Sequence, residues 1–167
     1  MVYGGMHADG NAERRMTADG AGTMEALYFG NATLYWKEKA KIPKEWHGAY
    51  IMADLEAGMY GGNDTFAPSN SPIDYDFNTL MLKGRTCEMS LKAGDAQTGK
   101  LTTKYNGGRP THADYHPMRK QGGLVLGVGG DNSHGAIGTW FEGAVTSGYS
   151  TDEVDDAVQA NIVTVGW

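Results

Sequence analysis

One short segment alternates between apolar and acidic residues in a way that suits an extended strand. Residues 50–56 read Tyr-Ile-Met-Ala-Asp-Leu-Glu, with aliphatic side chains at every second position, Ile51, Ala53 and Leu55. Side chains two residues apart on a β-strand point to the same face of a sheet. The segment therefore predicts a strand whose aliphatic face meets a core, with Asp54 and Glu56 together on the opposite, open face.

A third acidic residue lies in another glycine-bounded segment, at Asp131 of Gly129-Gly-Asp-Asn-Ser133. Carboxylates grouped on an open strand face suit glycoside hydrolysis, in which one carboxylate attacks and another acid protonates the leaving oxygen. A solvated strand edge explains the same alternation equally well. Periodicity alone leaves both interpretations open.

The composition favours a single β-rich domain, a sandwich of short strands joined by tight turns. Glycine accounts for 25 of the 167 residues, a share well above average usage. Such a chain is long enough for one domain with one substantial core. We read residues 1–23 as loop and expect two strands within 24–36 around a Gly30-Asn31 turn. Further strands are expected at 50–56, 75–83, 86–92, 100–106, 123–129 and 137–146.

One helix is predicted, at 151–163 near the end of the chain. Ser150 and Glu153 have the spacing of a capping box at its start. An apolar stripe of four residues should pack on the domain: Val154, Ala157, Val158 and Ile162. Three acidic residues are expected on the solvated face: Asp152, Asp155 and Asp156.

Several classes of function are disfavoured by charge and residue usage. The net charge of −6 comes without a basic stripe, which argues against a nucleic-acid partner. No apolar run approaches the roughly 20 residues of a membrane span, and the N-terminus lacks a signal-peptide pattern. Cys87 is the only cysteine, so we expect a semi-buried packing thiol rather than a nucleophile. The spacings of His112, His116 and His134 fit no zinc pattern, and no metal or cofactor is expected.

Several longer motifs resemble one known family along nearly the whole chain. They are Gly10-Asn-Ala-Glu13, Met24-Glu-Ala-Leu-Tyr-Phe-Gly-Asn31, Ile51-Met-Ala-Asp-Leu-Glu56, Gly127-Val-Gly-Gly-Asp-Asn-Ser133, Phe141-Glu-Gly-Ala-Val-Thr-Ser-Gly-Tyr149 and Gln159-Ala-Asn-Ile-Val163. Together they resemble the catalytic domain of family 54 glycoside hydrolases, the fungal-type α-L-arabinofuranosidases B.

This resemblance implies an all-β, concanavalin-like β-sandwich with one short C-terminal helix. It also implies a retaining, exo-acting enzyme that releases terminal arabinofuranosyl groups from arabinose-containing polysaccharides or oligosaccharides. By motif, Glu56 matches the family's nucleophile and Asp131 its general acid/base. The family is secreted, so the resemblance implies an extracellular protein.

Other residues match positions that bind the sugar in that family. Asp54 matches a carboxylate that holds sugar hydroxyls, while Met24 and Trp36 match side chains that line the sugar subsite. Gly130 matches a backbone position beside the acid/base. Glu142, on a predicted strand, is either a third cleft carboxylate or a structural hydrogen-bonding residue.

The chain also departs from the family pattern. No cysteine pair precedes Gly10-Asn-Ala-Glu13, and Ala57 replaces the asparagine that usually follows the nucleophile. Residues 1–167 resemble a single unit equal to the C-terminal half of the family's catalytic domain. Three explanations stay open: an oligomer or a partner chain completes a partial sandwich, the sandwich is a reduced one, or the chain is a fragment of a longer protein. The alternative function is a non-catalytic, glycan-binding or self-assembling structural sandwich.

Overall fold

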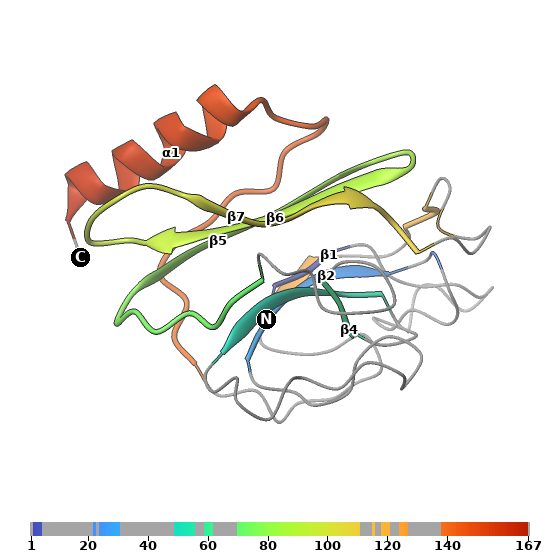
Figure 1. The fold of residues 1–167 in the computed structure, drawn as a ribbon, viewed down its shortest axis with the longest axis horizontal. Helices are drawn as coiled ribbons and strands as arrows, with labels where there is room; N and C mark the ends of the chain where they lie inside the picture. Colours follow the sequence, from blue (N-terminus) through green and yellow to red (C-terminus); the bar gives the residue numbers. More distant parts are fainter. Residues whose placement is uncertain are drawn as a thin grey trace.

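Two antiparallel β-sheets stack face to face, and the helix α1 (Asp152–Val165) covers one of them (Figure 1). The computed structural model describes residues 2–4, 22, 24–30, 49–55, 59–61, 70–110, 115, 118–120, 124–126 and 138–166. Within these residues, no helix combines the length and the apolar character needed to cross a membrane. The predicted β-sandwich with one C-terminal helix is confirmed.

The first sheet has five strands in the order β4-β3-β2-β1-β8. Their bounds are Met59–Tyr60 for β4, Tyr50–Asp54 for β3, Glu25–Gly30 for β2, Val2–Gly4 for β1 and Leu124–Leu126 for β8. The predicted strands at the start of 24–36 and at 50–56 are confirmed as β2 and β3, which pair in antiparallel register. The second strand expected within 24–36 lies outside the described residues.

The second sheet is a meander of β5 (Asn78–Arg85), β6 (Glu88–Asp95) and β7 (Thr102–Gly108). All three strands were predicted, but each one starts and ends two or three residues later than expected. The ladder extends through glycine and charged positions, such as Gly84↔Met89 and Arg85↔Glu88. Those residue types have low β-propensity, so a sequence pattern ends the strand too early.

The core lies between the two sheets and follows the alternation of their strands. The first sheet contributes Ile51 and Leu55, and the second contributes Met89 and Leu91, all with fully buried side chains. Burying such side chains stabilises the fold by about 1.5–3 kcal/mol each relative to exposure. The inter-sheet core therefore holds the edge of β3 against the second sheet.

Three strand predictions were wrong. The sequence pattern predicts a loop for residues 1–23, yet Val2–Gly4 forms β1 between β2 and β8. The two-residue β4 was not predicted at all. Both strands are too short to show a period, and both form only because a partner strand is adjacent. The reverse error concerns 137–146: no strand occurs within 138–150, where aromatic residues such as Trp140 and Phe141 are half exposed.

The helix α1 (Asp152–Val165) lies on the outer face of the second sheet (Figure 1). The side that faces the sheet is polar. Asp155 and Gln159 are 3 % and 2 % exposed, whereas Val154 and Val158 are 52 % and 45 % exposed. The predicted inward apolar stripe and the solvated Asp155 were therefore wrong. The reason is that Lys83 of β5 and Lys92 of β6 face outward from the second sheet and pair with Asp155 of the helix.

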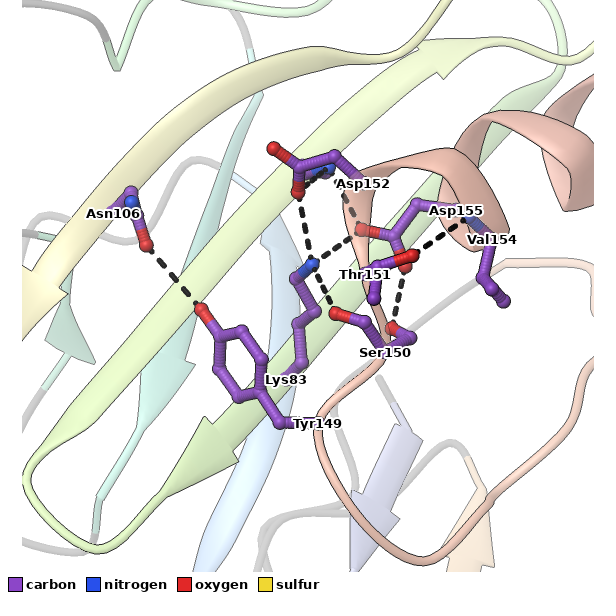
Figure 2. Close-up of polar contacts among 9 residues, drawn as sticks. Lys83, Asn106, Tyr149, Ser150, Thr151, Asp152, Val154 and Asp155 are labelled. Carbon is purple, nitrogen blue, oxygen red and sulfur yellow. Dashed lines mark hydrogen bonds and ion pairs between the residues drawn. The ribbon is translucent and has the colours of Figure 1, made fainter.

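A buried ionic cluster attaches the start of α1 to this sheet (Figure 2). The Asp155 carboxylate lies 2.5 Å from Lys83 Nζ and 2.7 Å from Lys92 Nζ. Asp152, which is exposed, contacts the same two amines at 3.2 and 2.7 Å. Ser150 Oγ donates to Asp155 at 2.5 Å. Long-range charge pairing therefore decides which face of the helix is buried.

Two further details of the prediction are corrected. The helix N-cap is Thr151, whose hydroxyl accepts a hydrogen bond from the Val154 amide at 3.4 Å. Ser150 is not the cap, because its hydroxyl bonds Asp155 instead. Cys87 is exposed rather than semi-buried, since it lies in the turn that connects β5 to β6.

Candidate active site

The candidate site is built on the end of β3, where Asp54 is the last strand residue. Its neighbours Ala53 and Leu55 are fully buried in the inter-sheet core. Asp54 therefore points to the outer face of the first sheet, which confirms the alternation predicted for this part of the segment. The outer face is not open along the whole strand, because Tyr50 and Met52 are also buried there.

Met24 lies on the same face as Asp54. The ladder places Ala26 of β2 directly opposite Asp54, and Met24 precedes Ala26 by two positions. Residues two apart on extended chain share a face, so Met24 is a diagonal neighbour of Asp54. Its side chain is 1 % exposed. Two of the six predicted site residues are thus brought to one face. The other four lie outside the described residues: Glu56, Asp131, Trp36 and Gly130.

Two buried side chains donate hydrogen bonds to backbone carbonyls of β3 and of the residue that follows it. Asn70 Nδ2 donates to the Ile51 carbonyl at 3.1 Å, and the Tyr115 hydroxyl donates to the Leu55 carbonyl at 3.2 Å. Both side chains are fully buried. β4 is only two residues long, so these side chains supply hydrogen bonds that a longer edge strand would make.

A buried ion pair lies on the core side of the same strand end, and sequence reasoning missed it. Glu25 of β2 accepts a hydrogen bond from Arg109 Nη2 at 2.8 Å, and Lys120 Nζ contacts its other oxygen. The side chains of Glu25 and Arg109 are 4 % and 2 % exposed. Glu25 belongs to β2 of the first sheet, and Arg109 directly follows β7 of the second sheet. The ion pair therefore joins the two layers next to Met24, the residue that precedes Glu25. The only sequence signal was an acidic residue at a core-facing position of β2.

Gly84 makes room for this ion pair, and we expect Gly84→Ala to destabilise the domain. A Cβ atom at Gly84 would lie 1.9 Å from Arg109 Nη2 and 2.9 Å from Glu25 Oε1. Arg109 would have to move and leave the buried carboxylate with a poorer partner. We expect the free energy of unfolding to fall by about 1–3 kcal/mol, as measured by urea denaturation.

Gly138→Ala is the matched control for this substitution. A Cβ atom at Gly138 would meet no atom of the described residues within 4 Å. That variant should keep the stability of the starting protein. Equal stability of the two alanine variants would show that Arg109 relocates without loss, and it would contradict the proposed role of Gly84.

Other candidates from the sequence gain no support as site residues. Glu142 is exposed on a segment without strand structure, so neither role considered for it is shown. Among the described residues, no group of three His, Cys, Asp or Glu side chains is placed to bind a metal ion. The three histidines considered as ligands lie outside those residues.

A family model described as "Alpha-L-arabinofuranosidase B, catalytic" matches residues 6–167. The chain belongs to this family. The resemblance seen in the motifs is thereby confirmed, and the match includes both the Asp54 strand and the Gly-Gly-Asp-Asn-Ser segment around Asp131.

Curated relatives of the α-L-arabinofuranosidase B family agree with this assignment. The chain is 45 % identical over 155 residues to alpha-L-arabinofuranosidase B of Aspergillus niger, a match that covers 92 % of the chain and 30 % of the relative. It is 44 % identical to an alpha-L-arabinofuranosidase of Hypocrea jecorina over the same shares. The chain therefore spans about a third of the length of these relatives.

Solved structures of the family share the fold. A GH54 α-L-arabinofuranosidase soaked with a cyclic sulfate inhibitor superposes with a TM-score of 0.82 at 38 % identity, covering 98 % of this chain and 32 % of that one. An arabinofuranosidase complexed with arabinofuranosyl-α-1,2-xylobiose gives a TM-score of 0.81 at 36 % identity, covering 97 % and 31 %. The α-L-arabinofuranosidase B family thus includes members of known structure that bind carbohydrate.

Proposed function

We propose that this chain carries the catalytic centre of a retaining, exo-acting α-L-arabinofuranosidase. The observation that carries the proposal is the position of Asp54, on the outer face of β3 within the family match. A relative of known structure is complexed with an arabinofuranosylated xylobiose. We therefore infer that the substrate is an arabinan- or arabinoxylan-type glycan with a terminal arabinofuranosyl group.

Glu56 acts as the nucleophile in this proposal, and Asp131 acts as the general acid/base. A carboxylate oxygen of Glu56 attacks the anomeric carbon while the glycosidic C–O bond breaks. Asp131 gives its proton to the leaving oxygen. Asp131 then takes a proton from water as the water oxygen attacks the anomeric carbon and releases Glu56. Two displacements at one carbon retain the configuration.

The remaining site residues bind the sugar. Asp54 accepts hydrogen bonds from sugar hydroxyls, and Met24 and Trp36 line the subsite with apolar surface. Gly130 offers its backbone beside the acid/base. The β2–β3 register supports the grouping of Asp54 and Met24. The pairing is unbroken from Tyr50 to Asp54, and it places Ala26, two residues after Met24, opposite Asp54.

We further propose that residues 1–167 form one structural unit, equivalent to the C-terminal half of the family's catalytic domain, which acts outside the cell. A second polypeptide segment completes the sandwich, from a partner chain or a second copy. The support is a set of apolar side chains that are 45–65 % exposed: Trp140, Phe141, Val145, Val154, Val158 and Val165. Apolar surface of this kind is typical of a site that contacts another polypeptide.

The same exposed surface favours the alternative function, a non-catalytic module that binds glycan or self-assembles. The two functions make different demands on the site. An assembly module needs the apolar surface of α1 and of residues 138–150, and it does not need Asp54. An enzyme needs the acidic residues whether or not the surface is covered.

The test is a hydrolysis assay with 4-nitrophenyl α-L-arabinofuranoside. The six-membered-ring isomer, 4-nitrophenyl α-L-arabinopyranoside, is the matched control, and sedimentation velocity is run on the same sample. Turnover of the furanoside alone, with retention of configuration seen by NMR, supports the enzyme. No turnover by a folded chain, either alone or assembled, would overturn the catalytic proposal and favour the binding or assembly module.

A further inference from the structure

We propose that Tyr115 is a positioning residue for the nucleophile at position 56. The inference rests on the proposed function and extends it to a residue outside the predicted site. Its basis is the hydrogen bond from the Tyr115 hydroxyl to the Leu55 carbonyl, 3.2 Å long and buried. The two residues are 60 positions apart, so only the tertiary fold brings them together.

Leu55 lies just beyond the ladder of β3. The last described pairs of that strand are Ala26↔Asp54 toward β2 and Asp54↔Met59 toward β4. Within the part of the chain that the structure describes, Leu55 forms no strand pair with β2 or β4. A bond to the Leu55 carbonyl supplies a fixed point at the place where the ladder ends.

That carbonyl belongs to the peptide group that joins Leu55 to residue 56. Peptide groups are planar, so the direction of the C=O bond also sets the direction of the next N–Cα bond. Fixing the Leu55 carbonyl thus orients the backbone from which the Glu56 side chain extends. A nucleophile must be held near its attack geometry, and small displacements are costly.

Tyr115 is suited to such a role because its side chain has little freedom to move. It is fully buried and packs in the inter-sheet core with Leu55 itself. A tyrosine side chain has few rotatable bonds, so burial fixes its hydroxyl at little entropic cost. Packing in the inter-sheet core therefore holds the Tyr115 hydroxyl at the Leu55 carbonyl, one residue before the candidate nucleophile.

The experiment compares Tyr115→Phe with Tyr105→Phe in the intact chain. Tyr105 of β7 also donates its hydroxyl to a backbone carbonyl, that of Gly108, at 2.5 Å. The Gly108 carbonyl keeps a second donor, Tyr60, at 3.2 Å. Each variant removes one buried or half-buried hydroxyl and keeps the ring, so the two variants share the general cost of the substitution.

We expect Tyr115→Phe to lower kcat on the aryl arabinofuranoside by roughly 10-fold to 100-fold, with KM changed less than about 3-fold. Tyr105→Phe should leave both constants unchanged. A positioning role moves kcat selectively, whereas partial unfolding lowers the active fraction in both variants alike. Equal activity of Tyr115→Phe and the starting protein would overturn the inference.

Hydrogen–deuterium exchange provides a readout that does not depend on turnover. Loss of the Tyr115 bond should speed exchange in peptides containing Leu55 by roughly 5-fold, and Tyr105→Phe should not. If the starting chain shows no turnover but this difference appears, the proposed function fails while the backbone contact stands. Unchanged exchange around Leu55 would overturn the positioning role whatever the activity.

Discussion

Glu56→Gln should abolish turnover of an aryl α-L-arabinofuranoside, with kcat lowered by roughly 10⁴-fold or more. Glutamine has nearly the same shape as glutamate but cannot form the ester bond to the anomeric carbon in the first displacement. Substrate binding should persist, so KM or a measured Kd should change little. The measurement is the initial rate of 4-nitrophenolate release, followed by its absorbance in a discontinuous assay.

Asp131→Asn, compared within the same experiment, separates the two carboxylate roles. Loss of a general acid costs typically 10²–10⁴-fold, and the cost depends on how badly the leaving group needs a proton. The variant should therefore recover part of its rate on substrates with acidic phenol leaving groups, whereas Glu56→Gln should not. Asp156→Asn, an exposed substitution on α1, is the control for loss of charge. Similar rates for all three variants would contradict the assignment of both roles.

The second large effect is expected at Asp155, where a buried carboxylate meets two buried amines. Asp155→Asn leaves Lys83 and Lys92, with side chains 8 % and 6 % exposed, without their buried counter-ion. Breaking a buried pair by removal of one partner costs about 3–5 kcal/mol. We expect a loss of that size in the free energy of unfolding, measured by urea denaturation at neutral pH.

Two acidic neighbours on the same helix provide controls for this prediction. Asp152→Asn removes an exposed partner of the same lysines and should destabilise much less, because water screens its charge. Asp156→Asn touches an exposed residue and should have no measurable effect. Equal losses at Asp155 and Asp156 would show that the buried cluster does not hold α1 on the sheet.

The pH dependence of stability gives an independent check of the same cluster. Burial alone would raise the pKa of Asp155, but the hydrogen bonds from Lys83, Lys92 and Ser150 outweigh it and hold the pKa below its usual value. The stabilisation is therefore present above the unfolded-state pKa near about 3.9 and is lost as pH falls through the lower folded-state pKa. The stabilities of the starting protein and Asp155→Asn should converge in that acidic range.

At alkaline pH, the titration of Lys92 determines how the stability of the cluster depends on pH. Burial alone would lower its pKa, but hydrogen bonds to Asp152 and Asp155 raise the pKa above its usual value. Its contribution is fully present below the unfolded-state pKa near about 10.4 and disappears as pH rises through the folded-state pKa. The cluster thus stabilises the attachment of α1 across the neutral range.

Local patterns predicted those parts of the fold in which one strand carries its own signal. The alternation around Asp54 was sufficient to predict the face on which Asp54 lies, because Ala53 and Leu55 share a core face whatever strand lies beside them. The meander of β5, β6 and β7 was likewise found from strand-forming residues between turns. For the site, the sequence motifs named Asp54 and Met24, and the structure places both on one face of the first sheet. The roles of Glu56, Asp131, Trp36 and Gly130 stay predictions.

By itself, then, the sequence determined the β-sandwich class, the family and the face on which Asp54 lies. Only the tertiary structure decided the pairing of β1, the Glu25–Arg109 ion pair, the inward polar face of α1 and the hydrogen bond from Tyr115 to Leu55. Side-chain alternation has a period of two residues and is legible within a few positions. The other contacts join residues that are distant in the chain, and their partners are selected by sheet register and packing, which no local pattern records.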